Sequence, residues 1–146
     1  MYGAVFDTNV LFEGLTNKAS SSHLLVKACL AGNLASHVSN ALLYEYLEIF
    51  ERKLSAERWQ LTKPILRTFI KQSHYVPIYF SYRPSSLDSD DDFLIDCVMN
   101  AQVPLITYNL KDFLSAKQEL GFELFRPHDY ILYLNQLAEY QKGASS

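Results

Sequence analysis

The chain has 146 residues, of which 49% are hydrophobic, and its formal net charge is -3. This length allows one sizeable hydrophobic core, so we expect a single domain over residues 1–142 and a disordered tail over residues 143–146. The charge excludes a uniformly basic nucleic-acid-binding protein, and no apolar run is long enough to span a bilayer.

The cysteines and the first residues bear on the cellular compartment. Cys29 and Cys97 lie within apolar helical patterns and have no His or Cys at the short spacing of a zinc site. Asp7 interrupts the apolar stretch that a signal peptide would need. We therefore expect buried thiols in a cytoplasmic protein without membrane contact.

Two apolar patterns alternate along the chain. Short apolar runs bounded by turn-forming residues predict buried strands, and apolar residues three or four positions apart predict helices. Pro64 is tolerated in the first turn of a helix. The predicted elements, in chain order, are a strand at 2–6, a helix from the serines at 20–22 to Gly32, a strand at 34–38, a helix from Ser39 or Asn40 through Leu54, a helix from Thr62 to Ser73, a strand at 75–80, a helix at 93–101, strands at 104–107 and 123–125, and a helix from Pro127 through Tyr140.

This alternation predicts an α/β fold. Strands that alternate with helices of this length form a mainly parallel sheet through right-handed crossovers. Helices then cover both faces of the sheet, which makes a three-layer α/β/α sandwich. In such sheets the ligand lies at the carboxyl ends of the strands.

Polar side chains follow the predicted strands at these ends. Asp7 follows the first strand, and Asn109 and Asp112 follow the strand at 104–107. A run of aspartates at 88–92 precedes the next helix. If these strands are parallel neighbours, their carboxylates meet at one rim of the sheet.

Glu45 is a further acid that helical geometry directs toward this rim. At 100° per residue it lies between Leu42 and Ile49, at the margin of the apolar stripe, whereas Glu48 and Glu51 fall on the outer face. We therefore expect Glu45 to lean into a cleft.

Several carboxylates close together raise one another's pKa, and a bound cation removes that conflict. Oxygen ligands without His or Cys favour Mg²⁺ or Mn²⁺. Such a site can activate water and stabilise an in-line displacement at phosphorus. The chemistry that we expect is phosphodiester hydrolysis.

Four short motifs, in their order and spacing, resemble those of the PIN domain family, in the group related to VapC-type toxin nucleases. The C-terminal Phe125-x-Pro127-x-x-Tyr130 also resembles the end of that family, so the resemblance covers nearly the whole chain. The four motifs are Val5-Phe6-Asp7-Thr8-Asn9-Val10-Leu11, Ser39-x-x-Leu42-x-x-Glu45-Tyr46-x-x-Ile49-Phe50-x-Arg52-Lys53, Asp90-Asp91-Asp92-Phe93-Leu94 and Leu105-Ile106-Thr107-x-Asn109-x-x-Asp112-Phe113.

The resemblance implies roles for individual residues. Asp91 is the favoured third acid, and Asp90 and Asp92 are alternatives to it. Asn109 stands where the family often has an acid, which passes the role of the fourth carboxylate to Asp112 or lowers the affinity for a second ion. The implied metal ligands are Asp7, Glu45, Asp90, Asp91, Asp92 and Asp112, of which Asp7, Glu45, Asp91 and Asp112 are the implied catalytic acids. The residues implied to brace the site are Thr8, Asn9, Thr107 and Asn109.

Each of these residues also has a structural interpretation. Asp7 with Thr8 could cap the turn after a strand, and aspartates gather at helix N-termini for reasons of the helix dipole. Asp112 could be the N-cap of a short helix. Glu45 taken alone is the kind of acid that is usually solvated.

RNA binding needs cations, and the clearest candidates lie on one predicted helix. Lys63, Arg67 and Lys71 recur every four residues and could face an RNA backbone. Further candidates are Arg52, Lys53 and Lys111. The alternative is a solvated helix face.

Three functions follow from these observations. The first is a metal-dependent endoribonuclease acting on single-stranded RNA, the toxin of a toxin-antitoxin pair, with an antitoxin partner and a homodimeric state. The second is a catalytically weak or inactive PIN-fold module that binds RNA or protein. The third is an unrelated α/β phosphatase or receiver domain with Asp7 as phosphate acceptor.

Overall fold

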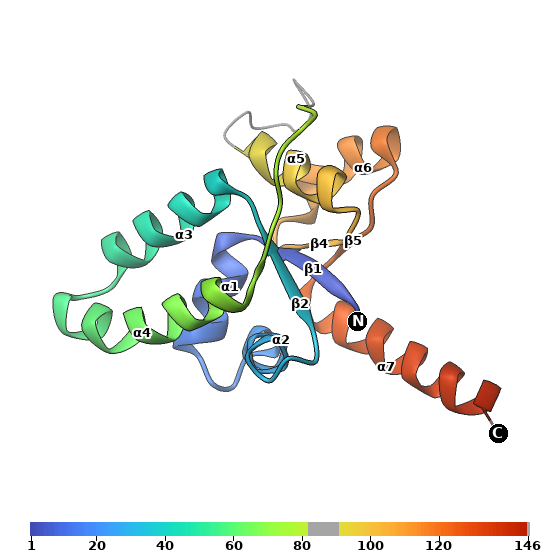
Figure 1. Ribbon diagram of the computed structural model, residues 1–146, viewed down its shortest axis with the longest axis horizontal. Coiled ribbons are helices and arrows are strands. Elements are labelled where there is room, and N and C mark those ends of the chain that lie inside the picture. Colours follow the sequence, from blue (N-terminus) through green and yellow to red (C-terminus); the bar gives the residue numbers. More distant parts are fainter. Residues whose placement is uncertain (82–90, 146) are drawn as a thin grey trace.

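The computed structural model describes residues 1–81 and 91–145, which form a five-stranded parallel sheet in the order β3-β2-β1-β4-β5 (Figure 1). Every pair of neighbouring strands is parallel, as the alternation of strands and helices predicted. The strands are β1 (Gly3–Phe6), β2 (Ala35–Val38), β3 (His74–Tyr75), β4 (Leu105–Ile106) and β5 (Leu124–Phe125).

Helices cover the two faces of this sheet, which confirms the predicted three-layer α/β/α fold. The chain runs from β1 outward to β3 at one side of the sheet, and from β4 to β5 at the other side. The helices are α1 (Thr8–Thr16), α2 (Ser21–Leu30), α3 (Asn40–Lys53), α4 (Ala56–Gln72), α5 (Asp92–Ala101), the 3-10 helix η2 (Leu110–Phe113), α6 (Leu114–Leu120) and α7 (Pro127–Ser145).

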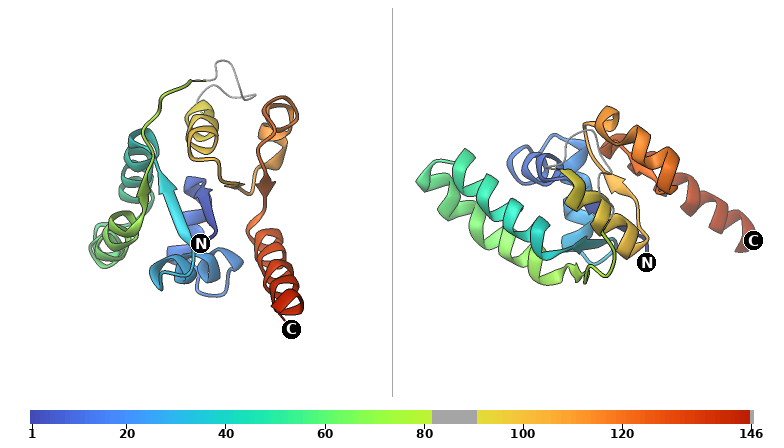
Figure 2. Two further views of the ribbon diagram at one scale, coloured as in Figure 1. Left: turned by 45° about the vertical axis from the view of Figure 1, so that its right-hand side comes forward. Right: turned by 90° about the horizontal axis from the view of Figure 1, so that it is seen from above.

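Two parts of the chain extend from the sheet. Helices α3 and α4 run side by side as a hairpin that projects away from the strands, and α7 projects on another side with the C-terminus at its tip (Figures 1 and 2). In the part of the chain that the structure describes, no helix is both long and apolar enough to cross a membrane.

From β1 the chain adds β2 and β3 on one side, and it then returns to add β4 and β5 on the other side of β1, so the order of strands reverses direction between β1 and β4. Val5 is paired with Leu105 and Phe6 with Ile106, so the two strands end side by side. The residues that follow them, Asp7 and Thr107, therefore emerge together at the carboxyl rim. This is the switch point at which sheets of this type bind ligands.

The core joins α3 and α4 to the middle of the sheet. Four aromatic side chains here are at most 1% exposed, namely Phe6, Tyr46, Phe50 and Phe69. Phe6 contacts Phe69 edge to face, with ring centroids 6.2 Å apart. The apolar stripe that was predicted for the helix from Ser39 thus anchors the α3–α4 hairpin. The predicted burial of both cysteines is also confirmed.

Helix α4 begins at Ala56, six residues before the predicted start at Thr62. Ser55 is its N-cap and accepts a hydrogen bond from the Arg58 backbone N–H at 3.2 Å. Pro64 consequently lies inside the helix and not in its first turn, which corrects the prediction. Its ring is on the exposed face, where the loss of one backbone donor is least costly.

Two further boundaries differ from the prediction. The strand expected over 75–80 is shorter, His74–Tyr75, and its last backbone hydrogen bond to β2 runs from the Val76 N–H to the Val38 oxygen at 2.8 Å. The C-terminal helix α7 continues to Ser145 and so takes in most of the predicted disordered tail. The single-domain assignment itself stays a prediction.

Candidate active site

Asp7 occupies the carboxyl end of β1 as the N-cap residue of α1. Its Oδ2 accepts a hydrogen bond from the Thr107 hydroxyl at 2.7 Å. Burial is the largest influence on the Asp7 pKa and raises it above the usual value. The hydrogen bonds from the Thr107 side chain and the Thr8 backbone lower that pKa, and the negative charge of Asp112 raises it. Asp7 is thus a carboxylate whose ionisation a nearby cation would favour.

The loop after β4 forms a local network around Thr107. The Asn109 backbone N–H donates to Thr107 Oγ1 at 3.0 Å, and this contact leaves the Thr107 hydroxyl proton for Asp7. The side-chain amide of Asn109 donates to the Asp112 carboxylate. Thr107, Asn109 and Asp112 therefore reach Asp7 as one connected unit.

Tyr108 ties the same loop to helix α2. Its hydroxyl lies 2.5 Å from the Ser22 Oγ, and Ser22 is fully buried whereas 44% of the Tyr108 side chain is exposed. The sequence analysis considered Ser22 only as part of a helix cap. No local pattern could reveal its partner, which lies 86 residues away.

Helix α3 is attached to β1 directly beside the candidate site. The Tyr46 hydroxyl, fully buried, donates to the backbone oxygen of Phe6 at 2.5 Å, and burial raises the Tyr46 pKa well above its usual range. Glu45 precedes Tyr46 and is half-buried. The helical placement of Glu45 at the margin of the apolar stripe thus holds in the structure.

The predicted third acid lies at the start of α5, which packs against β1. Asp91 is the N-cap residue and is half-buried, and Asp92 is 1% exposed. Asp96, one turn further, is 3% exposed. Asp90 lies outside the described residues. The deep burial of Asp92 makes it as strong a candidate as Asp91.

A hard divalent cation fits the donors around Asp7. Asp7 and Asp112 supply carboxylate oxygens, the negative charge of Asp112 raises the pKa of Asp7, and the buried Thr8 hydroxyl has no hydrogen-bond partner among the described residues. Mg²⁺ needs only one or two carboxylates because it keeps several waters. Within residues 1–81 and 91–145, no three or more His, Cys, Asp or Glu side chains come together as a metal-holding group, so the acids that the structure brings together here are the pair Asp7 and Asp112.

The predicted basic row lies on the opposite flank of α3. Lys63, Arg67 and Lys71 line a groove of about 420 Å³ whose α3 wall includes Leu43 and Leu47. The Lys63 ammonium lies 5.8 Å from the centroid of the Trp59 ring. Lys111, in contrast, lies in η2 next to Asp112. Glu51 of α3 also lines the groove, so the α4 cations lie beside an acid that is not one of the proposed metal ligands. Among the candidate RNA-binding residues, Lys111 is the one adjacent in the chain to a proposed ligand.

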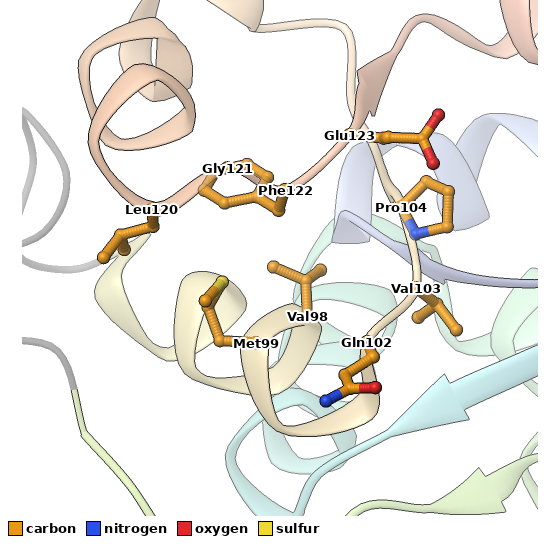
Figure 3. A pocket seen from close by; sticks show the side chains of 9 residues that line it. All are labelled: Val98, Met99, Gln102, Val103, Pro104, Leu120, Gly121, Phe122 and Glu123. Atoms are coloured by element: carbon orange, nitrogen blue, oxygen red, sulfur yellow. The ribbon is translucent and has the colours of Figure 1, made fainter.

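A second hollow, of about 260 Å³, lies at the other rim of the sheet. Val98, Met99 and Phe122 line it together with Pro104 and Glu123, which precede β4 and β5 (Figure 3). It therefore opens at the amino ends of the strands. Its position at the opposite ends of the strands separates it from the chemistry at Asp7.

Comparisons with known proteins show which of them this chain resembles. A family model described as PIN domain matches residues 3–111. No curated protein is significantly similar to the chain in sequence. Among solved structures, VapBC2 from Rickettsia felis bound to a promoter DNA fragment is similar with a TM-score of 0.58 and 14% identity, over 84% of this chain and 96% of that chain.

Two further structures are similar to the same extent. FitAcB from Neisseria gonorrhoeae has a TM-score of 0.59 and 16% identity, over 85% of this chain and 97% of that chain. FitAB bound to the IR36 DNA fragment has a TM-score of 0.58 and 16% identity, over 85% and 94% of the two chains. At these identities the likeness concerns the fold alone.

Proposed function

The chain belongs to the PIN domain family, and from this premise we propose that it is a metal-dependent endoribonuclease that hydrolyses phosphodiester bonds in single-stranded RNA. The observation that carries the proposal is the setting of Asp7. This carboxylate is half-buried at the switch point, is held by the Thr107 hydroxyl and senses the charge of Asp112. Burial beside a second acid favours a cation at this place.

We assign the ligands of Mg²⁺ or Mn²⁺ to the acids at this rim. Asp7 and Asp112 would hold the ion, with Glu45 from α3 and Asp91 or Asp92 from α5 as the remaining acids. The bound ion would lower the pKa of a water molecule and offset the charge of the phosphate. Thr107 and Asn109 act as positioning residues, since they fix the carboxylates of Asp7 and Asp112 before any ligand arrives.

The assembly state is part of the proposal. The similar structures are complexes named VapBC2 and FitAB, each in contact with DNA in at least one structure. We propose that this chain is likewise the toxin of a cytoplasmic toxin-antitoxin pair, that it forms a homodimer, and that an antitoxin blocks the rim at Asp7.

The basic row has a separate place in this scheme. These three cations belong to α4 and line its groove against the flank of α3 that faces away from Glu45. Lys63, Arg67 and Lys71 would therefore contact RNA remote from the scissile bond. Lys111 would contact a phosphate nearer to Asp112. Both contacts are electrostatic and independent of base sequence.

Asn109 supports one alternative, a PIN-fold module that binds RNA or protein without turnover. Its amide donates to the Asp112 carboxylate and so occupies one acceptor position of a proposed ligand. In this alternative metal and RNA bind, but no phosphodiester bond breaks.

The test is cleavage of a mixed set of labelled single-stranded RNAs with Mg²⁺ or Mn²⁺. We expect cutting by the unmodified chain and a loss of at least about 100-fold in Asp7→Asn, because the substitution removes charge without changing shape. Asp112→Asn and Asp92→Asn should each be impaired. Asp129→Asn is the matched control, since it removes one exposed carboxylate on α7.

Two results would count against the nuclease. Equal cutting by the unmodified chain and Asp7→Asn would point to a contaminating enzyme. Absence of cutting, with Mn²⁺ still bound in an Asp7-dependent manner, would favour the binding module. Phosphate attached covalently to Asp7 after incubation with a phosphate donor would favour the receiver or phosphatase interpretation.

A further inference from the structure

Lys53 ends helix α3 on the side that faces α1. Its ammonium donates to the Asn9 side-chain oxygen at 3.4 Å and lies 5.3 Å from the centroid of the Phe12 ring. Both partners belong to α1, whose N-cap is Asp7. Lys53 is therefore a cation fixed to the helix that begins at the candidate active site.

The charge of Lys53 is not neutralised by these contacts. An ammonium group has three N–H donors, and in the described part of the chain the Asn9 amide is the one acceptor that Lys53 uses. The side chain is exposed, and an amide oxygen and an aromatic ring carry no net charge. Lys53 thus keeps a full positive charge and donors for an anion from solution.

The first turn of α1 adds to this positive character. It contains no acidic side chain, and Asp7 is the only carboxylate at its cap. A helix N-terminus carries a partial positive charge that attracts anions. Asn9, which contacts Lys53, is exposed in this same turn, so the lysine and the helix end face solvent together.

The contact across α1 and α3 also restricts where the ammonium can move. The ammonium of Lys53 lies over the Phe12 ring, and Phe12 packs in turn on the buried Phe50 with ring centroids 5.1 Å apart. A long side chain that is already ordered loses less conformational entropy when it binds a ligand. A lysine side chain without such contacts loses more conformational entropy when it binds a ligand.

We propose that Lys53, positioned by Asn9, binds a phosphate of the RNA strand next to the scissile phosphate, an inference that rests on the proposed nuclease function. Lys53 then supplies the cation for the strand at the α1 side of the cleft. It is a substrate-binding residue and takes no part in the bond-breaking step.

The competing explanation is purely structural. Lys53 could do no more than tie the end of α3 to α1. In that case the loss of Lys53 would lower the melting temperature without changing the salt dependence of RNA binding. That salt dependence reflects the number of phosphates that the protein contacts.

The first experiment measures RNA affinity in the Asp7→Asn background, which cannot cut the probe. A fluorescein-labelled single-stranded RNA is titrated by anisotropy at several salt concentrations. We compare this background with additional Lys53→Met, Lys53→Gln, Lys53→Arg and Lys27→Met substitutions. Lys27 is an exposed lysine on α2 and serves as the matched control for the loss of one charge.

We expect Lys53→Met and Lys53→Gln to weaken binding about 5-fold to 10-fold, with the salt slope reduced by about 0.7, the value for one phosphate of a single strand. Lys53→Arg should restore both quantities, and Lys27→Met should leave them unchanged. Lys53→Met preserves the packing on Phe12, and a thermal melt of each variant verifies its fold.

A cleavage assay with Asp7 intact separates the two proposals. We expect Lys53→Met to raise KM about as much as it weakens binding and to change kcat less than about 2-fold. Unchanged KM and salt slope in a chain that cuts RNA would overturn the role of Lys53 alone. A chain that never cuts, but binds RNA through Lys53 as described, would overturn the nuclease and leave the phosphate contact standing.

Discussion

The two flanks of helix α3 differ in the chemistry that they present. One flank carries the half-buried Glu45, and Lys53 at the end of the helix contacts Asn9 of α1. The flank toward α4 carries Leu43 and Leu47 and forms an apolar groove with the α4 cations. One helix therefore separates a polar cleft from a basic and partly apolar groove.

This difference follows from helical periodicity and from a shared anchor. Tyr46 and Phe50 face the core between the two flanks, and helical periodicity turns Glu45, one position before Tyr46, and Leu47, one position after it, to opposite sides. A change at the anchor should disturb both flanks, whereas a change on one flank should spare the other. The predictions below test that separation.

The largest effect is expected at the anchor. Phe50 is fully buried and packs on Phe12, so Phe50→Ala should lower the free energy of unfolding by about 3–5 kcal/mol. Leu43→Ala on the α4 flank, where the side chain is half-buried, should cost about 1 kcal/mol. Urea denaturation of both variants measures the difference. Similar costs would show that the flank residues belong to the core.

The next effect concerns the cleft alone. Thr107→Val keeps the shape of the side chain but removes the hydroxyl that donates to Asp7 and accepts from the Asn109 N–H. Loss of a group that orients a metal ligand typically costs 10-fold to 100-fold in metal affinity or activity. We expect a loss of cleavage in that range, measured at saturating RNA over a Mn²⁺ titration.

Thr107→Ser is the control for this prediction, because it retains the hydroxyl. Serine should recover most of the activity that valine loses. If both variants cleave RNA as fast as the unmodified chain, the Thr107–Asp7 hydrogen bond contributes nothing to the reaction.

Sequence reasoning found the cleft residues whose position depends on local rules. Asp7 directly follows a short apolar strand, and the 100° turn per residue assigns Glu45 to the margin of the stripe on α3. The order β2-β1-β4 then brings Asp7 beside Thr107, as expected of parallel neighbours. The strand at 75–80 was assumed to neighbour them as well, but β3 lies at the far edge of the sheet.

The remaining features depend on contacts between residues far apart in the chain. Tyr46 was assigned to the core from its spacing, but its hydroxyl bonds Phe6 across 40 residues. The backbone over 79–80 does not continue the strand because the Asn100 side chain binds it instead. The start of α4 was placed too late because Pro64 was assigned to the first turn of the helix, whereas the N-cap is Ser55.

A smaller effect is expected on the α4 flank. Arg67→Gln removes one cation from the groove, so RNA affinity should fall about 2-fold to 5-fold and the salt slope by about 0.7. The maximal cleavage rate should not change, since this flank is separated from the acids by α3. Anisotropy and single-turnover cleavage measure the two quantities. A fall in the rate at saturating RNA would contradict the separation of the flanks.

The smallest effect lies at the far end of the α4 flank, where α4 leads into β3. His37 and His74 are register partners in β2 and β3, and their rings stack with centroids 5.1 Å apart. The pKa of His37 is lowered below its usual 6.5, mainly by burial and to a smaller extent by the charge of His74. As the pH falls below 6.5, the unfolded chain takes up a proton that folded His37 resists.

Folding stability should therefore decrease as the pH falls from 6.5 toward the lower pKa of folded His37. His37→Gln removes the titrating group, so the melting temperature of this variant should depend less on pH between 7.5 and 5 than that of the unmodified chain. His128→Gln, at an exposed position on α7, should retain the full dependence. Parallel pH profiles for all three proteins would show that the pH dependence does not arise from His37.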